Sequence, residues 1–141
     1  MTTAVQQRAQ SARGRAAHAP MMVGMGSPGT VALVSDDLMF ASQLSTTMRR
    51  AGGSAVLVAG DSVPDVAVVF VDLNDAVEPR LALIGRLRGE RPGLEIVGFS
   101  HHGDLELRRR ARASGATRVV NNGAIQAVAL RRSGLGAAGT S

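Results

Sequence analysis

Four short apolar runs, each ending in polar residues, constrain the fold of this chain more than any other feature. Runs of this length and composition predict strands buried on both faces, as in a parallel sheet. Ligands of open parallel sheets bind at the carboxyl ends of the strands, so these polar groups are expected to gather at one edge. The runs lie at 31–34, 66–71, 94–99 and 119–120, and they end in Asp36 and Asp37, Asp72, Ser100, and Asn121 and Asn122 respectively.

The segments between these runs carry helical signals. Ala41, Leu44 and Met48 are spaced three and four residues apart, as on the buried face of a helix. This helix is expected to follow Asp36 or Asp37, because either side chain can cap its first turn. Further helices are predicted over about 79–89, 105–114 after an Asp104 cap, and 125–132.

The alternation of strands and helices predicts one doubly wound α/β domain of the flavodoxin-like type. Its parallel sheet is expected to have five strands in the order 2-1-3-4-5. The second strand is predicted at 55–58, and only residues 60–65 separate it from the third. A connection of that length cannot hold a full crossover helix, so the second helix is expected to be reduced or missing.

Composition divides the chain into three parts. Residues 1–29 are rich in Ala, Gln, Gly, Ser and Arg, contain no acid, and show no apolar periodicity, so a disordered N-terminal extension is predicted. Residues 30–132 form the predicted domain. Residues 133–141 are rich in Gly and Ala and are expected to form a flexible tail.

The positive charge of the chain comes from arginine, since all 16 basic residues are Arg. The net charge is +5. Such a charge favours acidic partners or nucleic acid. The chain has no Tyr or Trp and only 3 Phe, so stacking platforms for bases are absent and nucleic-acid binding gains no further support. Cysteine is absent, which excludes disulfides and thiolate metal sites. No apolar stretch predicts a membrane span, and a cytoplasmic location is expected.

The order of the polar strand ends resembles the receiver domain of two-component response regulators, over about residues 30–130. Ser35-Asp36-Asp37 falls where that family has an acidic pair, and Val71-Asp72-Leu73-Asn74 falls at its acceptor aspartate. Ser100 falls at its conserved hydroxyl, and the stretch from Gly115 to Asn122 resembles the one that leads to its lysine.

The resemblance implies roles for these residues. Asp72 is the phospho-acceptor, and Ser100 and Asn122 stand where the family reads the phosphate. Asp36, Asp37, Asp72 and Asn74 are the implied Mg²⁺ ligands. Asn122 replaces the lysine, and a neutral amide cannot pair with an aspartyl phosphate as an ammonium does. The sequence therefore indicates an atypical receiver or pseudo-receiver.

The function that follows is a stand-alone receiver-like signalling module that acts through protein–protein contact, with or without phosphorylation of Asp72. Its expected partner is a histidine kinase or another signalling protein, docking on Arg108, Arg109, Arg110 and Arg112. No enzymatic activity is expected beyond self-phosphorylation. Two other classes remain open: a small α/β ligand-binding or enzymatic domain, and a basic nucleic-acid-associated protein.

Overall fold

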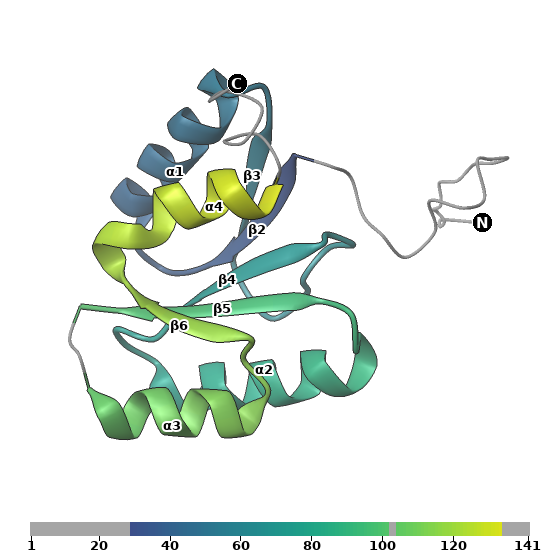
Figure 1. The fold of residues 1–141 in the computed structure, drawn as a ribbon, viewed down its shortest axis with the longest axis vertical. Helices are drawn as coiled ribbons and strands as arrows, with labels where there is room; N and C mark the ends of the chain where they lie inside the picture. Colours follow the sequence, from purple (N-terminus) through teal and green to yellow (C-terminus); the bar gives the residue numbers. More distant parts are fainter. Residues whose placement is uncertain (1–28, 102–103, 134–141) are drawn as a thin grey trace, which may run out of the picture.

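Five parallel strands form a single sheet in a computed structural model that describes residues 29–101 and 104–133 (Figure 1). The order β3-β2-β4-β5-β6, counted along the chain, is the predicted 2-1-3-4-5. The predicted extension and tail lie almost wholly outside the described residues. The strands are β2 (Thr30–Val34), β3 (Ser54–Val58), β4 (Val68–Asp72), β5 (Glu95–Ser100) and β6 (Arg118–Asn121).

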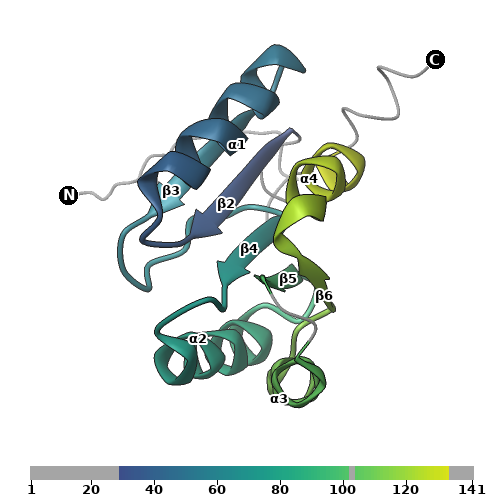
Figure 2. The ribbon, with the colours of Figure 1, turned by 90° about the vertical axis from the view of Figure 1, so that its left-hand side faces the viewer.

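Among the described residues, four α-helices cover the sheet, two on each face (Figure 2). Helices α1 (Leu38–Arg50) and α4 (Ile125–Ser133) lie on one face, and a short 3₁₀ turn, η2 (Asn122–Ala124), leads into α4. Helices α2 (Val77–Glu90) and α3 (Leu105–Ser114) lie on the other. The doubly wound arrangement predicted from the sequence is confirmed.

Each face of the sheet has its own apolar core, because successive strand residues point to opposite sides. Phe70 packs with Leu44 and Met48 on the α1 side. Its neighbour in β4, Val69, packs with Ile84 on the α2 side. The apolar runs of the sequence are continuous because both sides of the central strands are buried.

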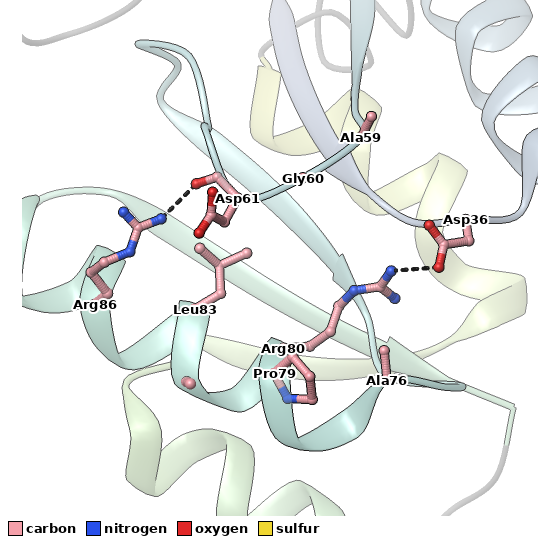
Figure 3. Close-up of a pocket in the computed structure, with 10 residues that line it drawn as sticks. Asp36, Ala59, Gly60, Asp61, Ala76, Pro79, Arg80, Leu83 and Arg86 are labelled. Atoms are coloured by element: carbon pink, nitrogen blue, oxygen red, sulfur yellow. Dashed lines mark hydrogen bonds and ion pairs between the residues drawn. The ribbon is translucent and has the colours of Figure 1, made fainter.

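The connection between β3 and β4 contains no α-helix, as its length predicted. The α2 side of β3 is consequently less covered, and Val56 is 40% exposed. A hollow of about 600 Å³ lies beside this connection, between the loop at Gly60 and Asp61 and the α2 residues Arg80, Leu83 and Arg86 (Figure 3).

Several element boundaries differ from the predicted ones. Helix α2 begins at Val77, two residues before Pro79, after Ala76 in a left-handed conformation (φ 52°). Pro79 fits there because the first amides of a helix have no partner in the helix. Strand β4 begins at Val68, two residues after Val66. The capping predictions hold, since Asp37 accepts a hydrogen bond from the Phe40 amide and Asp104 from the Leu107 amide. No helix among the described residues is long and apolar enough to cross a membrane.

Candidate functional site

The carboxyl ends of the strands bring the predicted polar residues to one edge of the sheet. Asp72 ends the central strand β4 and is 7% exposed, and Ser100 ends β5 and is 4% exposed. Asp72 lies opposite Phe99, and Ser100 lies opposite Asn121 of β6. We call this edge the carboxyl edge. Because these residues are buried, their polar groups need hydrogen-bond partners within the protein.

The carboxylate of Asp72 accepts three hydrogen bonds. Its Oδ2 accepts one from the Ser35 hydroxyl at 2.6 Å. Its Oδ1 accepts one from the Asn74 backbone amide and one from the Asn74 side-chain amide, each at 2.8 Å. Ser35 is itself held by the Asp37 backbone amide, which donates to the serine Oγ at 3.0 Å. Both oxygens of this buried carboxylate are therefore occupied by uncharged donors.

Asn74 continues the network to β5 and β6. Its Nδ2 donates to Asn122 Oδ1 at 3.2 Å, and its Oδ1 accepts from the His101 backbone amide at 2.7 Å. The Asn122 side-chain amide lies 3.1 Å from the His101 ring Nδ1. Asn122, which takes the place of a lysine in the resemblance, thus contacts Asn74 after β4 and His101 after β5 through an uncharged amide.

Arg80, in helix α2, contacts two residues of this edge, Asp72 and Asp36. It is 9% exposed, and its Nη1 donates to the Asp72 backbone carbonyl at 2.9 Å. Its Nη2 lies 3.2 Å from Asp36 Oδ2 (Figure 3). The Asp36 side chain, 70% exposed, is directed to this guanidinium. The guanidinium therefore ties the loop after β2 to the end of β4.

The side chains at the carboxyl edge offer a divalent cation few oxygen ligands that are not already engaged. Among residues 29–101 and 104–133, no three His, Asp or Glu side chains gather closely enough to hold a metal ion. Of the four predicted Mg²⁺ ligands, Asp72 and Asn74 lie together, Asp36 pairs with Arg80, and Asp37 caps α1. Mg²⁺ prefers carboxylate and water oxygens. Both carboxylate oxygens of Asp72 already accept hydrogen bonds, and the Arg80 guanidinium binds the backbone carbonyl of the same residue. A metal ion at Asp72 would have to displace hydrogen bonds from Ser35 or Asn74.

The predicted arginine docking surface on α3 is largely engaged within the domain. Arg108 donates to the Val119 carbonyl at 2.7 Å and to Asn121 Oδ1 at 3.0 Å. Arg109 pairs with Glu106, and Arg110 pairs with both carboxylate oxygens of Glu78 at 2.7 Å. The hydrogen bond from Arg110 to Glu78, together with the charge of Glu78, raises the pKa of Arg110 above its usual value. Arg112 remains exposed.

Large apolar side chains stand exposed around the same edge. Leu38 and Met39 at the start of α1 are 70% and 72% exposed, and Leu105 at the start of α3 is 73% exposed. These residues flank the Asp72 network on the two faces of the sheet. Their positions were not singled out from the sequence, because the helical pattern alone does not tell which apolar residues of a first turn lie beyond the sheet.

Solved structures similar to this one identify the fold. A response regulator from Burkholderia pseudomallei, solved with a phosphorylated aspartic acid, a calcium ion and citrate, matches with a TM-score of 0.58 at 18% identity. The match covers 65% of this chain and 58% of that regulator, so this chain corresponds to little more than half of it. The receiver domain of a Saccharomyces cerevisiae response regulator, solved with a histidine phosphotransfer signalling protein, matches with a TM-score of 0.58 at 16% identity, over 65% of this chain and 77% of that one.

This chain has the fold of a response-regulator receiver domain. A pilus assembly-related protein from Burkholderia pseudomallei shares it, with a TM-score of 0.61 at 16% identity over 79% of this chain and 95% of that protein. No family model and no curated protein matches the sequence. The receiver fold was predicted from the order of the strand-end residues.

Two residues of this receiver-like site were missed from the sequence. Ser35 directly precedes the predicted acidic pair, and its contact with Asp72 depends on which residue of the loop after β2 turns inward. Arg80 lies eight positions after Asp72, within a predicted helix, where an arginine is ordinarily expected in solvent. Its position one turn into α2 could have indicated that it reaches back to the end of β4.

Proposed function

We propose that this chain is a receiver-like signalling domain that acts by contact with another protein at its carboxyl edge. In this proposal Asp72 accepts hydrogen bonds that hold the edge together, and it is not phosphorylated. The observation that carries the proposal is the closed hydrogen-bond set around Asp72. A nucleophilic carboxylate needs an exposed oxygen in line with the phosphoryl donor and cations that stabilise the transferring group. Here both oxygens accept hydrogen bonds, and Asn122 supplies no charge.

The exposed apolar residues support a contact function. Protein interfaces are anchored by large apolar side chains within a polar rim. Leu38, Met39 and Leu105 provide such anchors around a rigid polar network at the carboxyl edge. A partner that binds there would contact the loops after β2 and β5, which the Ser35–Asp72 and His101–Asn74 hydrogen bonds tie to the end of β4. The partner class is a signalling protein, such as a histidine kinase or phosphotransfer protein.

The competing proposal keeps Asp72 as a phospho-acceptor with Mg²⁺. It is favoured by the place of Asp72 at the end of the central strand, beside the buried Ser100 on the adjacent strand. Phosphorylation in this form requires that Ser35 and Asn74 release the carboxylate and that Asp36 leaves Arg80. A ligand-binding or enzymatic α/β domain is less favoured, because the described residues contain no second titratable side chain bonded to Asp72.

Intact mass measurement separates the two proposals. The protein is incubated with acetyl phosphate and Mg²⁺, alongside an Asp72→Asn variant. The contact proposal expects no added phosphoryl group on either protein. An added phosphoryl group that is lost in Asp72→Asn would establish phospho-acceptance and overturn the contact-only proposal.

Site-specific photo-crosslinking in the cell tests the contact itself. A photoreactive residue at Met39 or Leu105 is expected to give a discrete crosslinked product. The same residue at Val56, which is exposed in the middle of the edge strand β3 and outside the carboxyl-edge loops, serves as the matched control. Equal products from all three positions would show that the carboxyl edge is no preferred contact.

A further inference from the structure

The edge of the sheet opposite Asp72 is rich in arginine. It consists of the amino ends of the strands and the last turns of the helices, and we call it the amino edge. The last turns of α1, α2, α3 and α4 each contain arginine. By contrast, Asp36, Asp37, Asp72 and Asp75 lie at the carboxyl edge. The amino edge also holds Glu90 and Glu95, so its positive charge comes from the larger number of arginines.

A shallow hollow of about 660 Å³ lies at this amino edge. It is lined by four arginines from four elements and by a single carboxylate, that of Glu95. Glu95 Oε2 lies 3.5 Å from Arg118 Nε and 3.1 Å from Arg132 Nε. One carboxylate thus serves two guanidiniums. The four arginines are Arg88, Arg112, Arg118 and Arg132.

Arginine is favoured in the last turn of a helix because it complements the helix dipole, and Arg88 fits that role. Its guanidinium donates to the carbonyls of Gly115 and Pro92 and to the Thr117 hydroxyl. Arg112 is different: it is exposed, and its side chain makes no hydrogen bond or ion pair within the described part of the chain. The same holds for the exposed Arg49, Arg50 and Arg131 at this edge.

The surroundings of these arginines favour a phosphate backbone over a protein surface. The large apolar side chains that are exposed among the described residues lie elsewhere: Leu38, Met39 and Leu105 at the carboxyl edge, and Val56 and Leu57 on β3. Protein interfaces need apolar anchors, whereas interfaces with nucleic acid are polar and strongly positive. In addition, residues 1–28 contain three arginines and no acid, and they join the domain through Gly29, beside Ser54 at this same edge.

We propose that the amino edge binds the phosphate backbone of nucleic acid, without reading base sequence. Arginine binds phosphate oxygens through two parallel N–H donors, and such contacts position a protein on nucleic acid without sequence information. No aromatic residue lines the hollow, so stacking of bases on aromatic rings is not expected there. The inference is independent of the contact proposed at the carboxyl edge, since the two surfaces lie at opposite ends of the strands.

Salt-dependent binding of the full chain to a fluorescein-labelled duplex DNA of mixed sequence tests the proposal. Fluorescence anisotropy gives log K against log salt concentration, whose slope falls by about 0.9 for each phosphate contact removed. The test variant is Arg112→Gln/Arg132→Gln, which removes two arginines of the hollow. The matched control is Arg109→Gln/Arg110→Gln, which removes the same charge from the middle of α3, outside the hollow, where the two arginines pair with Glu106 and Glu78. Thermal melting of each variant confirms that it is folded.

The proposal expects the wild type and the control variant to bind with similar steep slopes, and the test variant to lose about 1–2 units of slope. A second duplex of unrelated sequence is expected to bind equally well. Absence of binding by the wild type, or equal loss in both variants, would overturn the proposal. Competition by polyglutamate as effective as competition by unlabelled DNA would also overturn it, because the surface would then be one for acidic proteins.

Discussion

The hydroxyl of Ser35, at the end of one strand, donates a 2.6 Å hydrogen bond to the carboxylate of Asp72, at the end of the next strand in the sheet. Both residues are buried, with 2% and 7% of their surface exposed. A short bond between a hydroxyl and a carboxylate is among the stronger neutral-to-charged hydrogen bonds. It fixes the loop after β2 relative to the central strand, and the other oxygen of the same carboxylate accepts the hydrogen bonds from Asn74.

Replacing Ser35 by Ala is expected to lower the free energy of unfolding by about 1–3 kcal/mol, because it leaves one oxygen of a buried carboxylate without its donor. Urea denaturation measures the change. Ser42→Ala, at an exposed position of α1, is the control and is expected to change stability by less than about 0.5 kcal/mol. Equal effects of the two substitutions would show that the Ser35 bond contributes nothing to stability.

Asp72→Asn is expected to destabilise the fold, by about 1–3 kcal/mol, because an amide cannot accept hydrogen bonds at both of its ends as the carboxylate does. Chemical denaturation with and without the substitution checks this. An increase in stability would indicate instead that the carboxylate is held in an unfavourable environment, as in a site kept ready for a cation.

Millimolar Mg²⁺ is expected to leave the melting temperature of the wild type unchanged, because a ligand stabilises the fold only when it binds the native state. The occupied oxygens of Asp72 and the pairing of Asp36 with Arg80 leave the metal no set of carboxylates. A thermal shift titration with MgCl₂, with CaCl₂ in parallel, makes the measurement. A saturable rise in melting temperature that Asp72→Asn abolishes would contradict this expectation.

Arg80→Met is expected to cost about 1–3 kcal/mol, mainly through the lost hydrogen bond to the buried Asp72 carbonyl. Its ion pair adds little, because Asp36 is 70% exposed and its charge is screened by water. Arg86→Met, on the same helix but with a side chain 43% exposed, is the matched control and should cost less. Denaturation curves that place the two variants at equal stability would refute a special role for Arg80.

Gly115→Ala tests the end of α3. Gly115 has φ 129°, and a Cβ built there would lie 2.6 Å from Arg88 Cβ. Strain in the backbone and this close approach together are expected to cost about 1–3 kcal/mol or more. Gly89→Ala, near the end of α2 with open space around its Cβ, is the control and should be neutral or slightly stabilising. Comparable melting temperatures for both variants would contradict the expectation.

The parallel sheet and its strand order could be predicted from the sequence alone. Apolar runs such as 66–71 predict buried strands, and in parallel strands the residues that follow them meet at one edge. The short connection at 60–65 was enough to predict the missing helix, because a chain that short cannot form a helical crossover. Asp37 and Asp104 were recognisable as helix caps, since capping depends on neighbours close in sequence.

The partners of the strand-end residues could not be predicted in this way, because they depend on how the elements pack. Whether Ser35 or Asp36 faces Asp72 depends on how one loop turns over a neighbouring strand, and Arg80 reaches Asp36 from a helix more than forty positions later in the chain. The engagement of Arg108 and Arg110 within the domain likewise depends on contacts between elements. Hydrophobic periodicity fixes which face of an element is buried, whereas hydrogen bonds and ion pairs are chosen by side-chain geometry once the elements are packed.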